Sequence, residues 1–221
     1  MPFVILFVCL CFMASYKYIH QPTVNSVFPP PGSVSAAPAP GPAEPAAEPG
    51  GMSRPDEKKE ALDIYRQGYQ AYAAHHYSES IGYFDRAINL DPACYQAYSY
   101  KGAALAFAGR YQQAMPLLDK AIMLNPHYED AYFNKAISLE LAGVYGQALI
   151  FYDQALEVNA RDPWAYYGKA SIYGRLRDVD ACVKNLKQAI AIDPSTREHA
   201  KTEADFNNVR NAPAFQQLVY R

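Results

Sequence analysis

The residues best suited to metal chemistry gather in one short stretch of the chain. His75, His76 and Glu79 carry imidazole and carboxylate groups, which are ligands that transition metals bind. They also fall where the hydrophobic pattern is interrupted, and polar residues in such a break are ordinarily solvated turn residues. We expect the turn, and therefore no metal site.

No other set of residues has the spacing of a catalytic or cofactor-binding motif. The sequence contains no recognisable Ser/His/Asp or Cys/His arrangement, paired-carboxylate signature, GxGxxG or P-loop. GRLRDVD at 174–180 is expected to be a solvated turn rather than a phosphate cradle. Cys9, Cys11, Cys94 and Cys182 form neither a CxxC pair nor a dense disulfide framework. We expect no enzyme and no cofactor.

Composition limits the class of protein. Of 221 residues, 50% are apolar and 19% are charged, which suits one globular domain with appendages. A net charge of −2 gives no electrostatic reason to expect a nucleic-acid partner. The 19 tyrosines suit partly buried, partly wet surfaces, so they fit cores and interfaces alike.

Residues 1–20 form an apolar amino-terminal segment around the run FVILFVCLCFMA at 3–14. The run has the length of a signal-peptide core and is too short for a confident membrane span. No Lys or Arg precedes it, and no clear cleavage site follows it. We expect an exported or membrane-anchored envelope protein, attached through residues 3–15, with the membrane side left open. The alternative is a wrongly assigned start or a buried amino-terminal tail, and then a cytoplasmic protein.

Residues 21–55 are expected to be a disordered linker rich in Pro and Ala. The stretch SVSAAPAPGPAEPAAEPGG lacks apolar bulk, so nothing in it can offset the loss of chain entropy on folding. A spacer is the favoured interpretation, and a polyproline ligand is the alternative. From Asp56 onward apolar residues recur at helical spacing, with Ser53 or Asp56 as the expected cap and Glu57 in the first turn.

An internal repeat of 34 residues predicts the fold. INLDP at 88–92, IMLNP at 122–126 and IAIDP at 190–194 share one ending, and LEVNA at 156–160 occupies the missing place. This period defines four units, 61–94, 95–128, 129–162 and 163–196.

Three positions of every unit hold only small residues, where we expect antiparallel helices to approach closely. They are Gly68, Gly102, Ala136 and Ala170; Ser80, Ala114, Ala148 and Cys182; and Ala87, Ala121, Ala155 and Ala189. Two other positions are bulky and are expected to fill the gaps between helices. They are Ile64, Tyr98, Tyr132 and Tyr166, and Phe84, Leu118, Tyr152 and Leu186.

Each unit also breaks midway. Gly109 and Gly143 suit the left-handed end of a helix, whereas the first and fourth units have His75 and Arg177 near the break and lack a glycine there. A proline at the end of a unit stops one helix or opens the next.

This pattern resembles the tetratricopeptide repeat family. The resemblance implies an all-α, right-handed superhelical solenoid of four helix-turn-helix repeats over 56–221, closed by capping helices at 197–221. The style of the repeats and linker resembles bacterial members. One departure is the seventh position, where Gln67, Lys101, Lys135 and Lys169 replace a common Leu.

The resemblance also implies a function. The first helix of each unit lines a concave groove that binds a peptide or helix of a partner protein. By position the groove residues are Tyr65, Arg66, Tyr69, Tyr72, Tyr100, Phe107, Phe133, Asn134, Glu140, Trp164, Tyr167 and Arg175. The competing interpretation is that these aromatic residues pack between units. The Lys/Arg/Asn clamp that binds acidic chain ends in one subfamily is not present.

We therefore expect a protein-interaction scaffold. The alternative is a self-assembling homo-oligomeric module, and a repeat-built enzyme or sugar-binding protein is less favoured.

Overall fold

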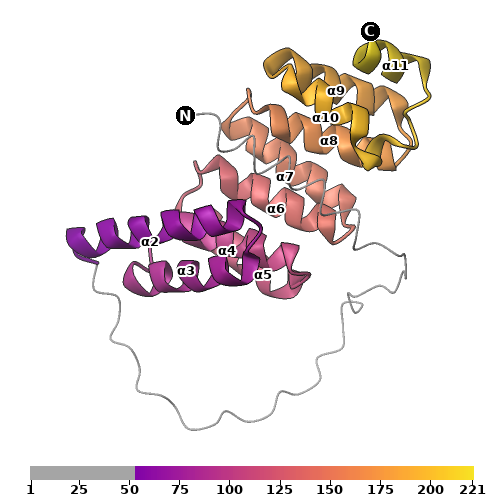
Figure 1. Cartoon of the computed structure of the whole chain (residues 1–221). Helices are drawn as coiled ribbons and strands as arrows, with labels where there is room; N and C mark the ends of the chain where they lie inside the picture. Colours follow the sequence, from indigo (N-terminus) through magenta and orange to yellow (C-terminus); the bar gives the residue numbers. More distant parts are fainter. Residues whose placement is uncertain (1–52) are drawn as a thin grey trace, which may run out of the picture.

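The structure is a computed structural model that describes residues 53–221. The predicted signal or anchor segment and nearly all of the predicted linker lie outside the described residues. Every regular element in the described part is a helix (Figure 1). The bounds are α2 Pro55–Ala73, α3 Tyr77–Leu90, α4 Tyr95–Phe107, α5 Tyr111–Leu124, α6 Glu129–Leu141, α7 Tyr145–Val158, α8 Pro163–Arg175, α9 Val179–Ile192, α10 Ser195–Thr202, η2 Ala204–Phe206 and α11 Pro213–Tyr220.

The helices form four antiparallel pairs that follow one another along the chain (Figure 1). Each unit contributes a first helix (α2, α4, α6, α8) and a second helix (α3, α5, α7, α9). The expected all-α solenoid of helix-turn-helix repeats is therefore confirmed. No helix between residues 53 and 221 has both the length and the hydropathy to cross a membrane.

The first helix begins differently from our expectation. Arg54 is the N-cap, and Glu57 accepts a hydrogen bond from the Arg54 backbone N–H at 2.7 Å. Ser53 instead donates to Asp91 Oδ1 at 2.9 Å. Neither Ser53 nor Asp56 caps the helix, so that prediction was wrong. Glu57, the third residue of the helix, accepts a hydrogen bond from the Arg54 N–H, which has no acceptor within the helix.

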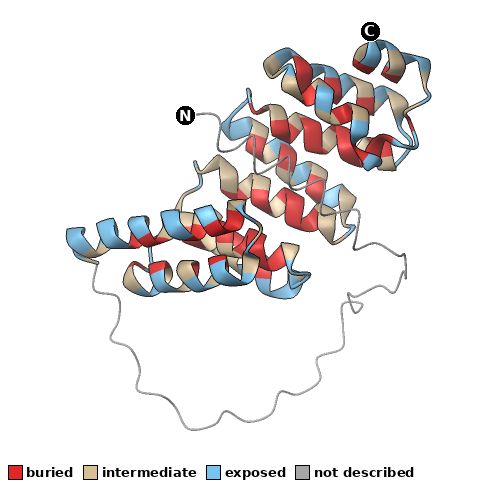
Figure 2. Ribbon diagram, viewed as in Figure 1, coloured by how far each residue is buried: buried red, intermediate tan, exposed pale blue. Residues whose placement is uncertain are grey.

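Small and bulky positions interlock in the core. All twelve residues of the three small columns are buried, as are the four bulky residues Phe84, Leu118, Tyr152 and Leu186 (Figure 2). A Cβ atom added at Gly68 would lie 2.7 Å from the Phe84 ring, and one at Gly102 would lie 2.6 Å from Leu118. The small residues let the paired helices approach this closely.

Overpacking one small column should destabilise the domain. Ala148 on α7 is fully buried, so Ala148→Phe is expected to cost roughly 1–3 kcal/mol of unfolding free energy. Chemical denaturation measures the loss. The control is Gln147→Phe at the neighbouring exposed position, which should change stability little. Equal stability of the two variants would contradict this packing.

The turns within the units all use a left-handed residue. Gly109 and Gly143 have φ of 74° and 76°, as their sequence positions predicted. In the two units that lack this glycine, His75 and Arg177 adopt φ of 63°. A side chain carries a steric cost in this region, so the same turn is built at all four places with unequal strain.

Exchanging residues at these turns should move stability in opposite directions. Arg177→Gly is expected to stabilise the domain by up to about 1 kcal/mol, because glycine removes the steric cost of the left-handed conformation. Gly143→Ala should destabilise it by a similar amount. Thermal denaturation of both variants is the measurement. A lower melting temperature for Arg177→Gly would show that its side chain contributes more than its backbone conformation costs.

The unusual lysines of the seventh position form a repeated ion pair. Lys101, Lys135 and Lys169 on the first helices pair with Asp85, Asp119 and Asp153 on the second helix of the preceding unit. The three lysine side chains are only 13–21% exposed. We call this series the Asp–Lys ladder. Its ends differ: Gln67 stands in the first lysine place, and Lys187 stands in the last aspartate place.

Stacking of the units defines an inner face. Neighbouring first helices α2, α4, α6 and α8 contact one another, and each second helix contacts the first helix of the next unit. The first helices therefore lie on the inside of the stack. We call their shared solvent-facing side the concave face.

The carboxyl-terminal elements cover the end of the stack. α10 and α11 pack on α9, and η2 packs on α8. Phe206 of η2 and Phe215 and Val219 of α11 are buried there. We call 195–221 the cap.

Candidate partner-binding face

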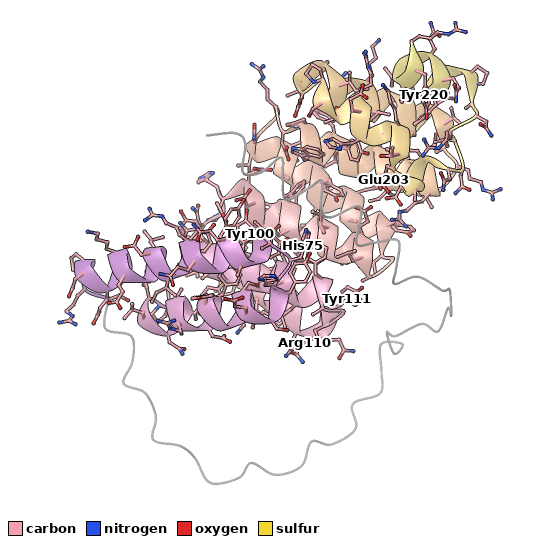
Figure 3. All side chains as sticks on the ribbon, viewed as in Figure 1. His75, Tyr100, Arg110, Tyr111, Glu203 and Tyr220 are labelled. Atoms are coloured by element: carbon pink, nitrogen blue, oxygen red, sulfur yellow. The ribbon has the colours of Figure 1, made fainter. Side chains whose placement is uncertain are left out.

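An aromatic cluster fills the junction between the first two units. Tyr69 and Tyr72 pack edge-on against Tyr100, with ring centroids 4.9 and 5.3 Å apart. Tyr65 lies 5.9 Å from the same ring, and Phe107 lies 6.0 Å from Tyr72. Five of the predicted groove residues therefore meet in one cluster. We call these five residues the aromatic cluster, and Figure 3 labels Tyr100 beside His75 at this junction.

Within the aromatic cluster, Tyr72 and Tyr100 are core residues, with 3% and 8% of their surface exposed. Burial raises the pKa of the Tyr100 hydroxyl well above its ordinary value, and nearby Asp130 adds to the shift. Tyr65, Tyr69 and Phe107 are half-buried, although burial raises the pKa of the Tyr65 hydroxyl above its ordinary value.

The carboxylate of Asp130 lies beside the aromatic cluster and accepts hydrogen bonds from two tyrosine hydroxyls. Tyr100 donates to its Oδ2 at 3.1 Å, and Tyr128 donates to the same atom at 2.7 Å. Two hydroxyl donors stabilise the ionised carboxylate without a cation. The charge on this part of the concave face is therefore engaged within the protein.

A polar seam joins the second and third units. Asn134 Nδ2 donates to Ser99 Oγ at 2.9 Å, and Ser138 donates to the Asn134 carbonyl at 2.7 Å. Asn134 is 4% exposed. This predicted groove residue thus joins α6 to α4, and its amide is engaged in that contact.

The fourth unit directs its aromatic residues toward the cap. Trp164 and Tyr167 are 8% and 1% exposed, with ring centroids 5.6 Å apart. Tyr167 lies edge-on to Phe206 of the cap at 5.5 Å.

Phe133 belongs to α6 of the third unit. It is half-buried, and its ring centroid lies 5.8 Å from that of Tyr152.

An ionic cluster connects the third unit, the fourth unit and the cap. Arg175 Nη2 lies 2.5 Å from Asp205 Oδ1, and its Nε lies 4.0 Å from Glu140. Ser171 contacts both carboxylates and donates to Glu140 Oε1 at 3.0 Å. Tyr152 donates to Glu140 Oε2 at 2.7 Å. These five residues, which we call the ionic cluster, bring Glu140 and Arg175 of the predicted groove together.

The ionic cluster holds two carboxylates and only one guanidinium, and the pKa of Glu140 is raised. Burial, followed by repulsion from Asp205, raises the pKa of Glu140 to about 7. Arg175, Tyr152 and Ser171 oppose the shift by stabilising the ionised form. A third carboxylate, Glu203 of the cap, is also buried and has its pKa raised to about 7, chiefly by that burial (Figure 3).

The ionic cluster corrects one sequence prediction. Residues 174–180 were expected to be a solvated turn, but Gly174 and Arg175 form the last turn of α8. A Cβ atom added at Gly174 would lie 2.9 Å from the Asp205 carbonyl oxygen, so glycine lets the cap approach. The contribution of Asp205 was missed, because residues 197–221 were expected to be a cap outside the repeats, although Asp205 lies one period of 34 residues after Ser171. Gly174 was the available clue.

Arg66 lies apart from these clusters. Its side chain is 68% exposed and pairs with Asp63 on the same helix at 2.5 Å. A pair this exposed contributes little to stability. Arg66 is therefore a rim residue of the concave face.

The histidines of the first turn lie near the aromatic cluster. His75 Nδ1 is 2.7 Å from the Tyr77 hydroxyl, and burial lowers the pKa of His75. His76 faces Glu79 at 3.5 Å. Between residues 53 and 221, no group of three His, Cys, Asp or Glu side chains is placed to hold a metal ion. Cys182 is fully buried, and burial raises its pKa to about 12.

Comparisons with known proteins agree with this architecture. Residues 165–196 match the family model described as tetratricopeptide repeat. A crystal structure of MamA is 22% identical, covers 62% of this chain and 81% of MamA, and has a TM-score of 0.52. The structure of YrrB, described as a TPR protein with an unusual peptide-binding site, is 15% identical with a TM-score of 0.50, covering 74% of this chain and 88% of YrrB.

The APC/C hetero-tetramer Cut9–Hcn1 gives a TM-score of 0.61 at 17% identity, over 76% of this chain and 32% of that one. No curated protein sequence matches the chain. At these identities the structural likenesses show the fold.

The helix pairs and the interlocking columns give residues 53–221 the fold of a tetratricopeptide-like helical-repeat solenoid, and residues 165–196 match the tetratricopeptide repeat family model itself. The fourth unit is the part that the family model matches directly, and the other three share its helical geometry.

Proposed function

We propose that the protein is a scaffold whose concave face binds a helix or extended segment of a partner protein. Tetratricopeptide folds support protein–protein interaction in general, and YrrB is described as having a peptide-binding site. One observation carries the proposal for this chain. Four half-buried aromatic residues lie on three successive first helices, namely Tyr65, Tyr69, Phe107 and Phe133. Aromatic side chains are favoured anchors for partner chains.

The location of the protein belongs to the same proposal. The apolar run at 3–14 supports export or membrane attachment, and the Pro/Ala-rich segment supports a spacer between that attachment and the repeats. The partner would then be a protein of the cell envelope. Fractionation of cells that express the full chain tests this part, and recovery entirely in the soluble cytoplasmic fraction would contradict it.

Affinity capture from the source organism under mild cross-linking tests the binding face. The baits are the full chain, a variant with Tyr69→Ala and Phe133→Ala, and a control with Met123→Ala on α5, where the side chain is 66% exposed. Circular dichroism checks that each bait is folded. The proposal predicts partners that the wild type and the control retain and the first variant loses.

Identical partners for all three baits would place binding elsewhere on the molecule. Capture of this protein alone would favour self-assembly instead.

A further inference from the structure

A cavity of about 300 Å³ lies at the turn between α4 and α5, where the second unit meets the third. Its apolar walls are Tyr111 and Met115 of α5, Leu139 of α6, and Ala142, which follows α6. Its polar lining comes from Arg110 and the two glutamines after Tyr111, which are all exposed. Figure 3 labels Arg110 and Tyr111 at this turn. None of these residues belongs to the predicted groove, so the cavity is a separate candidate site.

The equivalent turn of the first unit contains an aromatic ring. His75 lies one period of 34 residues before Gly109, which also lines the cavity, and both residues are left-handed. The half-buried imidazole of His75 lies edge-on to the Tyr77 ring at 5.7 Å, and its Nδ1 is 2.7 Å from the Tyr77 hydroxyl. Tyr77 is the equivalent of Tyr111. A Cβ atom added at Gly109 would meet no other side chain within 4 Å. The first unit therefore supplies a ring from its own chain where the second unit has a cavity.

The walls of the cavity indicate which kind of ring it accepts. The Tyr111 hydroxyl donates its hydrogen to the Leu141 carbonyl at 3.2 Å, so its oxygen is left to accept a hydrogen bond from an N–H group. The thioether of Met115 contacts aromatic rings favourably, and the guanidinium of Arg110 can lie over one. The volume is at the lower end of the range for small-ligand pockets, which suits a single ring system. An indole combines the N–H donor with a large apolar surface, and tryptophan is among the residues that most often anchor a partner protein.

We propose that the cavity binds the indole ring of a tryptophan from a partner protein, with the indole N–H donating to the Tyr111 hydroxyl oxygen. The ring takes at the second unit the place that the His75 imidazole takes at the first. This inference goes beyond the proposed function, since it needs no residue of the concave face. A partner segment with an exposed tryptophan is thereby anchored at the turns of the solenoid, beside the junction of the second and third units.

Methyl NMR of the full chain with isotopically labelled methionine methyl groups tests the proposal, and N-acetyltryptophanamide is the probe. The ring current of a bound indole should shift the Met115 methyl signal in a saturable manner. The Met123 signal should not move, since that side chain lies on the same helix but is 66% exposed and does not line the cavity. N-acetyl-1-methyltryptophanamide lacks the N–H and should bind roughly fivefold more weakly, the loss expected for one hydrogen bond. Tyr111→Phe should remove this difference between the two probes.

Two histidine variants test the comparison between the units. Gly109→His places an imidazole where the first unit has His75, so it should fill the cavity and abolish the shift of Met115 by the probe. Gly143→His is the matched control, because it puts the same side chain into the same left-handed turn one unit later. This control should bind the probe as the wild type does. Equal loss of binding in the two variants would contradict the assignment of the probe to the cavity.

The wild type alone can also overturn the proposal. It is overturned if N-acetyltryptophanamide produces no saturable shift of Met115, or if the two probes bind equally well. Should a histidine variant not fold, the two probes on the wild type and on Tyr111→Phe still decide. A shift caused by free indole but not by N-acetyltryptophanamide would assign the cavity to a small molecule and overturn its assignment to a protein side chain. Partner capture with Tyr69→Ala and Phe133→Ala reports on the concave face only, so the proposed function and this inference can fail separately.

Discussion

Arg175→Met is expected to lower the unfolding free energy by about 3–5 kcal/mol, because it leaves the carboxylates of Glu140 and Asp205 buried without their cation. The side chain of Asp205 is only 4% exposed, so water cannot replace the guanidinium. Urea denaturation measures the loss, and hydrogen exchange should show the greatest loosening in the cap. Arg161→Met is the control, since it removes an exposed guanidinium of the same size.

A loss as small as that of Arg161→Met would contradict the structural role of the ionic cluster. Acidification provides a further check. The pKa of Glu140 is raised to about 7 by burial, and its protonation removes one of the unpaired charges, so the difference between Arg175→Met and the wild type should shrink as the pH falls.

The stability of the wild-type domain should also fall as the pH rises from about 5 to 8. The pKa of Glu140 is raised from 4.5 to about 7, so between these values the folded state binds more protons than the unfolded state. The stabilisation is present at low pH and is lost as the pH passes through the folded-state pKa. For Glu140 alone the loss is roughly 2–3 kcal/mol.

Unfolding free energies at pH 5 and pH 8 measure this dependence. Glu140→Gln should reduce the difference, whereas Glu157→Gln on the exposed side of α7 should leave it unchanged. Glu203 and Glu129 have pKa values raised to about 7 and 9 by burial and by neighbouring carboxylates, so part of the slope should persist in the variant. Stability that rises with pH in the wild type would contradict this assignment.

The sequence was most informative where packing imposes a residue type at a fixed period. The glycines of the small column opposite Phe84 and Leu118 can be recognised, because even an added Cβ atom would clash there. The glycine turns followed from the same reasoning. The left-handed His75 and Arg177 show that the repeated geometry also forms without glycine.

The candidate site was harder to predict than the fold. An aromatic residue on a first helix suits a core and a binding surface equally, and burial alone separates Tyr100 from the half-buried Phe133. The groove set as a whole therefore stays a prediction. The ionic cluster depends on Asp205, which lies one repeat period of 34 residues after Ser171 but in the cap, where the residue types of the four units do not recur. Contacts of this kind depend on how the cap docks.

The Asp–Lys ladder has a consequence for how the chain could grow. Each of the two inner units carries a lysine toward the unit before it and an aspartate toward the unit after it. A tandem duplication of residues 95–128 would therefore bring matched charges to both of its new junctions. Gln67 and Lys187 offer no such match at the outer ends. A unit added inside the solenoid would keep its Asp–Lys pairs, whereas a unit added before Gln67 or after Lys187 would not form them.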